Sequence, residues 1–224
     1  MKPQSITESI VEQLRIHIVG GALKPGQKLN ESKLSSHFGV SRPPLREAFR
    51  SLENEKLVTS VSRKGSYVTD ISLEDCQEIF EVREMIECAA IDLFKEKKIN
   101  NLPEVAAVIK QTADLTVPTS SEPRIRFEYL MAIANFHIKL VESANNSRLT
   151  HFYNAISLSL ARYQALYMYD ELVMNRSKGV HQQILRSIKA GNYADAKKIL
   201  RSHIRGFLEF MRNRLELKKA SGIN

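Results

Sequence analysis

Three arginines recur at four-residue intervals shortly after Gly39. Arg42, Arg46 and Arg50 would share one face of a helix, because residues four apart lie on the same side. The apolar side chains of this segment fall on a different stripe, made of Leu45, Ala48, Phe49 and Leu52. A guanidinium group can donate two hydrogen bonds to the acceptor atoms of guanine in the major groove. The spacing therefore predicts base reading by Arg42 and Arg46 at the start of the helix, with Arg50 farther along the same face.

Other residues near this helix suit the phosphate backbone. Ser41 precedes the helix and is placed to cap it, and Lys33 belongs to the helix before it. Phosphate contacts fix the register of a protein on DNA but convey little sequence information. Lys64 and Gly65 fall at the tip of a predicted hairpin, where glycine allows close approach of the backbone to the duplex. The alternative is a basic, solvated helix surface; the succession of short helix, glycine turn, arginine-bearing helix and basic hairpin favours DNA binding.

Three of the six histidines fall on predicted apolar helix faces, namely His137, His181 and His203. Imidazole nitrogens suit zinc, nickel and similar ions, and convergent side chains in a helical bundle form such sites. Each histidine could instead be a neutral, hydrogen-bonded core residue. A third alternative is direct binding of an organic anion by the histidines with help from Arg83 and Arg162, although both arginines could equally be surface or ion-paired residues.

An enzyme is the rival class of function. The three histidines would then hold a catalytic metal with an open coordination position. The sequence has no HExxH motif, no glycine-rich phosphate loop and no evident nucleophile and base near these histidines. A metal or metabolite binder that does not engage DNA is a further alternative, disfavoured by the arginine helix and the basic hairpin.

The composition sets the broad class. The chain has 224 residues, of which 43% are hydrophobic and 26% charged, as in soluble proteins of one or two domains. A net charge of +8 favours a polyanionic partner. Two cysteines, Cys76 and Cys88, indicate no disulfide framework, and no run approaches the roughly 18 apolar residues of a membrane span. We therefore expect a cytoplasmic protein without a membrane partner.

Two domains are predicted from the periodicity. Helices over 5–19, 31–38 and 42–56 and a hairpin of strands at 57–61 and 66–70 make residues 1–71 a winged helix-turn-helix with three helices and a β-hairpin wing. No strand is expected beyond residue 71, so residues 72–224 should form an all-α helical bundle. Its predicted helices span 72–98, 101–116, 123–145, 148–170, 176–190 and 192–216. The fold class is therefore mainly α.

The N-terminal segment closely resembles the winged helix of the GntR superfamily of transcriptional regulators. The resemblance covers about residues 6–71 and rests on residues 29–53, LNESKLSSHFGVSRPPLREAFRSLE, followed by Gly65 and Val68. It implies DNA contacts from Ser41, Arg42, Arg46 and Gly65. The family usually has threonine where this chain has Pro43, so a side-chain hydroxyl is missing from this DNA-binding position and a changed operator preference is expected.

The C-terminal segment resembles the FCD effector domain of the FadR-type subfamily over roughly residues 74–213. The matching stretches are EVREMIECAA at 81–90, NFH at 135–137, HQQILRSIKAG at 181–191 and the pair at 203–204. In many such domains the three histidines bind a divalent metal together with an aspartate one helical turn before the first histidine. That position is Ile133 here. Three neutral histidines still satisfy the minimum for an open zinc- or nickel-type site, so metal binding and its absence both stay open.

The resemblance also implies partners and a mode of regulation. Arg83 matches the position of a pocket residue in the resembled domain. The subfamily implies a homodimer that binds a pseudo-palindromic, double-stranded DNA operator, with half-sites about one helical turn apart. It further implies a repressor that a small carboxylate metabolite releases from the operator.

Overall fold

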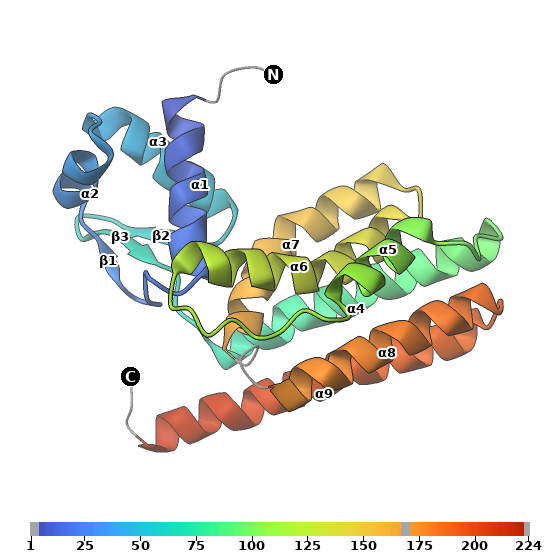
Figure 1. The fold of residues 1–224 in the computed structure, drawn as a ribbon. Coiled ribbons are helices and arrows are strands. Elements are labelled where there is room, and N and C mark those ends of the chain that lie inside the picture. Colours follow the sequence, from blue (N-terminus) through green and yellow to red (C-terminus); the bar gives the residue numbers. More distant parts are fainter. Residues whose placement is uncertain (1–4, 167–170, 222–224) are drawn as a thin grey trace. The chain divides into compact units, whose positions relative to one another are not determined.

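The computed structural model describes residues 5–166 and 171–221 and divides the chain into two compact units. The first comprises residues 1–71 with 118–130, and the second comprises 72–117 with 131–224. Helices dominate both units, and the strands gather in one small sheet (Figure 1). The predicted mainly α fold class is confirmed.

The first unit is a winged helix-turn-helix. Its helices are α1 (Ile6–Val19), α2 (Glu31–Phe38) and α3 (Arg42–Asn54), and its strands are β1 (Lys28–Leu29), β2 (Val58–Val61) and β3 (Gly65–Val68). The strands form an antiparallel sheet in the order β1-β3-β2. Strand β1 was not predicted, because two residues are too short to show an alternating pattern.

Local sequence signals explain where these helices begin and end. Ser5 and Glu8 form a capping box on α1, and Asn30 accepts a hydrogen bond from a backbone amide at the start of α2. Gly39 ends α2 with φ 64°, a left-handed conformation that glycine adopts without strain. The prediction that Ser41 caps α3 is wrong: Ser41 occupies the capping position, but its side chain makes no capping hydrogen bond. A capping side chain accepts a hydrogen bond from the backbone amide of the second or third helical residue. In α3 these residues are Pro43 and Pro44, which have no N–H.

The loop before α6 packs within the first unit. A Cβ atom added to Gly20, directly after α1, would lie 2.2 Å from the carbonyl oxygen of Pro123. A non-glycine residue could not occupy this position without displacing backbone. Helix α6 (Pro123–Glu142) therefore begins against the end of α1 and continues into the second unit.

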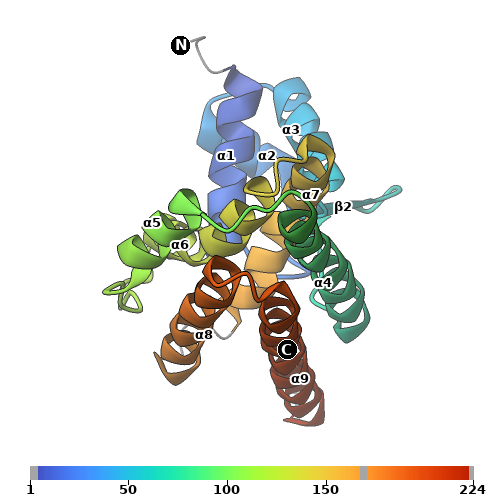
Figure 2. The same cartoon turned by 90° about the vertical axis from the view of Figure 1, so that its right-hand side faces the viewer.

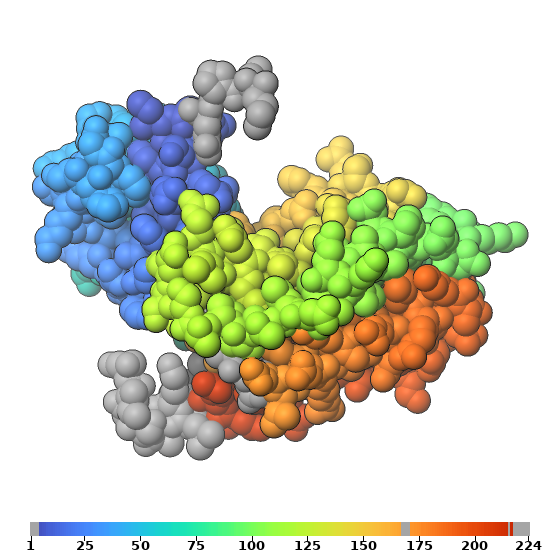
Figure 3. All heavy atoms as spheres, in the orientation of Figure 1, coloured from blue at the N-terminus to red at the C-terminus, as the bar shows by residue number. Residues whose placement is uncertain are grey.

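The second unit is all α among the described residues, as predicted. Besides the rest of α6 it contains α4 (Leu73–Glu96), α5 (Pro103–Thr112), α7 (Ser147–Ala165), α8 (Glu171–Lys189) and α9 (Tyr193–Ser221). Helix α4 packs against α7 and α9, and α8 packs against α9 and α5 (Figure 2). Helices α8 and α9 form a continuous surface along one side of this unit (Figure 3).

Several helix boundaries differ from the sequence predictions. Helix α9 ends at Ser221, five residues beyond the predicted end at 216, and α5 ends at Thr112, four residues before the predicted end at 116. Helix α8 begins at Glu171, five residues before the predicted start at 176. Helix α7 ends at Ala165, and residues 167–170 of the predicted helix lie outside the described residues. No helix in the described part of the chain is both long and apolar enough to cross a membrane.

Candidate DNA-binding face and effector site

The start of α3 presents its arginines to solvent. Arg42, Arg46 and Arg50 are all exposed, whereas the apolar stripe is buried, with Leu45 0% and Phe49 3% exposed. Packing of this stripe against α1 and α2 fixes the rotation of the helix about its axis. The predicted outward placement of the arginines is what the structure has.

The other predicted DNA contacts surround this face. Ser41, Pro43, Lys33 and Lys64 are exposed. Gly65 begins β3 with φ 107°, a conformation that only glycine adopts readily. The wing tip can therefore present its backbone to a ligand without a side chain in the way.

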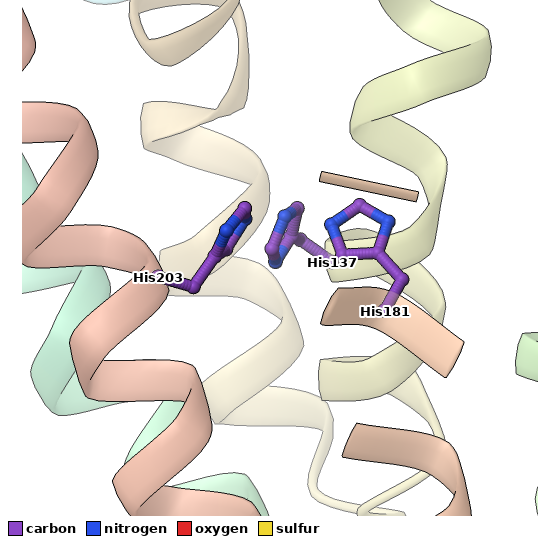
Figure 4. Close-up of side chains that lie close together, drawn as sticks. All are labelled: His137, His181 and His203. Atoms are coloured by element: carbon purple, nitrogen blue, oxygen red, sulfur yellow. The ribbon is translucent and has the colours of Figure 1, made fainter. Parts of the chain in front are cut away.

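The three predicted histidines converge in the second unit. His137 comes from α6, His181 from α8 and His203 from α9, and their imidazole rings gather around one point (Figure 4). One potential ligand atom from each lies within 4.8 Å of the others. His137 and His181 are buried, and His203 is partly exposed. Helical periodicity predicted this convergence correctly.

A buried carboxylate beneath the histidines was missed by sequence reasoning. Glu87 on α4 is 0% exposed and accepts hydrogen bonds from three side chains. Its Oε1 lies 2.7 Å from Arg83 Nε and 3.0 Å from the Tyr153 hydroxyl, and its Oε2 lies 2.8 Å from His137 Nδ1. The available signal was the four-residue spacing of Arg83 and Glu87, which places both on one face of a helix.

The charges in this network follow from burial and pairing. Burial would raise the pKa of Glu87, but His137 and Arg83 outweigh it and lower the pKa to about 2. Burial, reinforced by the charge of Arg83, lowers the pKa of His137 despite the facing carboxylate. Burial and neighbouring imidazoles also lower the pKa values of His181 and His203. The histidines are therefore neutral near pH 7, and His137 donates its Nδ1 proton to an ionised Glu87.

This proton placement determines what His137 can bind. With Nδ1–H directed at Glu87, the lone pair of Nε2 is the one available to a ligand. A carboxylate that orients a histidine through its second nitrogen is the usual arrangement behind metal-bound histidines. The network thus prepares one imidazole for coordination.

The histidines line a cavity of about 510 Å³. Arg83 also lines it, as predicted, but Arg162 is a buried residue of α7 that is not among the lining side chains; on that helix Gln164 faces the cavity instead. Sequence reasoning also missed two lining cations, Arg176 on α8 and Lys198 on α9. With Asp195 as the acidic group in the lining, the balance of charge suits an anion.

Comparison with known proteins identifies the family. The model of bacterial regulatory proteins of the gntR family matches residues 6–68, and the FCD domain model matches residues 78–206, more than half of the chain. The chain belongs to the GntR family and carries an FCD domain. As a GntR-family protein, it is a DNA-binding transcriptional regulator and not an enzyme.

Individual relatives extend over nearly the whole GntR-family chain. The HTH-type transcriptional regulator YdhC of Bacillus subtilis is 26% identical over 96% of this chain and 95% of its own length. The HTH-type transcriptional repressor GlaR of Escherichia coli is 25% identical over 85% of this chain and 89% of its own length. The crystal structure of a GntR transcriptional regulator from Rhodococcus sp. RHA1 has the same fold, with a TM-score of 0.76 and 21% identity over 92% of this chain and 97% of that one.

The donor set of this GntR-family regulator fits a divalent metal only in part. Three neutral imidazoles are suitable ligands for zinc or nickel. Ile133 lines the same cavity and offers no oxygen, and the cluster of potential ligands found among the described residues contains no carboxylate. Any metal here would be held by three protein ligands and keep open positions.

Proposed function

We propose that the protein is a homodimeric repressor whose two α3 helices read the half-sites of a pseudo-palindromic operator. The carrying observation is the exposure of Arg42 and Arg46 at the start of α3, in front of a buried apolar stripe. The first residues of the second helix of such a motif are those that contact base edges, and half-sites lie about 34–36 Å apart. The neighbouring residues would flank these contacts along the phosphate backbone; they are Ser41, Pro43, Lys33, Arg50, Lys64 and Gly65.

The dimer is supported by apolar side chains exposed on two adjacent helices. On α4, Val82 is 41% and Met85 66% exposed, and on α7, Phe152 is 60% exposed. Val82 and Met85 are three residues apart and share one face of α4, and large apolar groups exposed together are typical of association sites. We expect Met85→Glu to shift the protein from dimer to monomer in analytical ultracentrifugation; an unchanged sedimentation coefficient would remove α4 from the interface.

We further propose that the effector is a small carboxylate bound in the histidine cavity. The volume of about 510 Å³ falls in the usual range for small-molecule sites. Arg176 and Lys198 offer positive charge, beside Arg83, which is paired with Glu87. A divalent metal of the zinc or nickel type would be held by His137, His181 and His203 and would supply Lewis-acid attraction for an anionic effector. Regulation requires that the effector bind one arrangement of the protein better than the other, with a typical coupling of about 1–3 kcal/mol.

DNA reading can be tested by fluorescence anisotropy. A duplex is first selected from a randomised library with the unmodified protein, and its affinity is then measured for Arg42→Ala and Arg46→Ala. Loss of a bidentate arginine contact is worth about 1–3 kcal/mol in each half-site, so we expect each variant of the dimer to bind at least about 5- to 150-fold more weakly. Arg148→Ala, which removes an exposed arginine from α7, is the matched control and should bind normally. Unchanged affinity in both α3 variants would refute the proposed reading.

Metal binding can be tested by elemental analysis of the purified protein. We expect a divalent metal that is lost in His137→Ala and kept in His151→Ala, which alters an exposed histidine of α7. Equal metal content in the two variants would refute the assignment to the histidine cluster. The effector role is tested by screening small carboxylates for those that raise the melting temperature of the protein and adding these to the operator complex. Carboxylates that bind in the cavity should weaken operator binding. Carboxylates that stabilise the protein but leave its operator affinity unchanged would contradict the effector role.

A further inference from the structure

One of the three α3 arginines is held by an acidic residue of the preceding helix. Both Nε and Nη2 of Arg46 lie 3.0 Å from Oε2 of Glu31, the first residue of α2. The side chain of Arg46 is nevertheless 61% exposed, and that of Glu31 is 31% exposed. The ion pair therefore lies at the surface, beside the proposed DNA-binding face.

The geometry of this pair leaves the outer end of the guanidinium available. Glu31 occupies the edge made by Nε and Nη2, so Nη1 and the second proton of Nη2 remain for another acceptor. These two donors form the end-on fork that matches the O6 and N7 acceptors of guanine. An arginine already held in this way also loses less side-chain freedom when it binds.

The carboxylate has a second effect, on the charge of the face. In the described part of the chain, Arg42 and Arg50 form no ion pair within 4.0 Å, so Arg46 differs from both. A carboxylate beside Arg46 offsets its attraction for phosphate, which is the part of binding that ignores base sequence. An ion pair this exposed contributes little to folding stability, so the pair is not explained by stability.

We infer that Glu31 is a specificity-determining residue, which orients Arg46 for base reading and weakens the attachment of the protein to DNA of any sequence. The inference rests on the proposed base-reading role of Arg46. Glu31 acts through Arg46 and is thus a positioning residue. Its effect should be seen in the ratio of two affinities, for operator and for unrelated DNA.

The test compares Glu31→Gln and Glu31→Ala with Glu47→Gln. Glu47 is an exposed acid of α3 whose carboxylate accepts a hydrogen bond from Thr7, so its neutralisation changes the charge of the same unit by the same amount. The probes are the selected operator, a shuffled duplex of equal length, and operators with single guanine substitutions. Each affinity is measured from about 50 to 200 mM salt, the range over which phosphate contacts lose strength.

We expect both Glu31 variants to bind the shuffled duplex several-fold more tightly, with a salt slope steeper by up to about 0.9 per subunit. Glu31→Ala should also lower the penalty for substituting the guanine that Arg46 contacts, about 5- to 150-fold in the unmodified protein, to a fewfold effect. Glu47→Gln should leave that penalty unchanged. Equal behaviour of the Glu31 and Glu47 variants, or an undiminished guanine penalty in Glu31→Ala, would overturn the inference. If Arg46→Ala itself keeps the guanine penalty, the proposed reading by Arg46 fails instead.

Discussion

Removal of the Glu87 carboxylate should destabilise the protein severely, because three buried donors depend on it. In Glu87→Ala, the guanidinium of Arg83, which is 2% exposed, loses its counter-charge. The imidazole of His137 and the hydroxyl of Tyr153 lose their acceptor at the same time. All three side chains are buried, with Arg83 and His137 2% and Tyr153 3% exposed, so none of them is hydrated like a surface group when the carboxylate is removed.

The size of the effect follows from these lost interactions. A buried charge left without its partner costs about 3–5 kcal/mol. Each neutral donor left unsatisfied costs about 1–3 kcal/mol more, unless water fills the space. The loss should therefore be at least about 5 kcal/mol, a large part of the 5–15 kcal/mol that stabilises a typical domain. Glu87→Gln keeps the volume and an acceptor for Arg83, so a smaller loss of about 3 kcal/mol is expected.

Urea denaturation of the chelator-treated protein, followed by circular dichroism, measures this loss. The control is Glu84→Ala on the same helix: Glu84 pairs with Arg201 and Arg205, whose side chains are 49% and 69% exposed and stay hydrated without it. Only a small change is expected there. The double variant Arg83→Met with Glu87→Met, which replaces the buried pair by apolar groups, should recover most of the lost stability. Glu87→Ala within 1 kcal/mol of the unmodified protein, on the scale of an ordinary surface substitution, would refute this reasoning.

Three further changes probe other parts of the structure. Pro43→Thr restores a backbone amide that the Ser41 side chain can cap, and it adds a hydroxyl to the DNA-binding face. Fluorescence anisotropy should therefore show a few-fold tighter binding to the operator and to the shuffled duplex alike; weaker binding would contradict this. Gly20→Ala should lower the free energy of unfolding by about 1–3 kcal/mol, because its methyl group meets a carbonyl oxygen at the start of α6. The control is Gly179→Ala in α8, where the added methyl group enters open space, and it should not destabilise the protein in the same urea titration. The metal-free protein should lose stability as pH falls from 6.5 to 5, because burial holds the pKa of His181 well below the ordinary value and His181 takes up a proton on unfolding. His181→Gln should reduce this loss of stability by up to about 2 kcal/mol. Parallel pH profiles of the two proteins would exclude the contribution of His181.

Features set by local pattern were predictable from the sequence. The outward arginines of α3 follow from the spacing of Leu45 and Phe49, and the end of α2 follows from Gly39. The convergence of the three histidines also follows, because each lies on the apolar face of its helix and such faces meet in a bundle core.

Features set by long-range packing were not predictable. Glu87 and His137 are fifty residues apart, so no periodicity connects the carboxylate to the imidazole. Arg162 and Gln164 lie two residues apart on α7, and which one faces the cavity depends on the rotation of that helix. Ser41 does not cap α3 because the prolines that follow it have no amide proton to donate. The general preference for serine at a helix start does not take such neighbours into account.

The central claim, that the start of α3 reads guanine in the major groove, is tested most directly by a double-mutant cycle between protein and DNA. Operators in which single guanines are replaced by 7-deazaguanine lack the N7 acceptor and are titrated against the unmodified protein and Arg46→Ala. We predict that replacing one particular guanine in each half-site weakens operator binding by the unmodified protein and leaves binding by Arg46→Ala unchanged. Equal weakening of both proteins at every guanine, or no weakening of either, would contradict the claim.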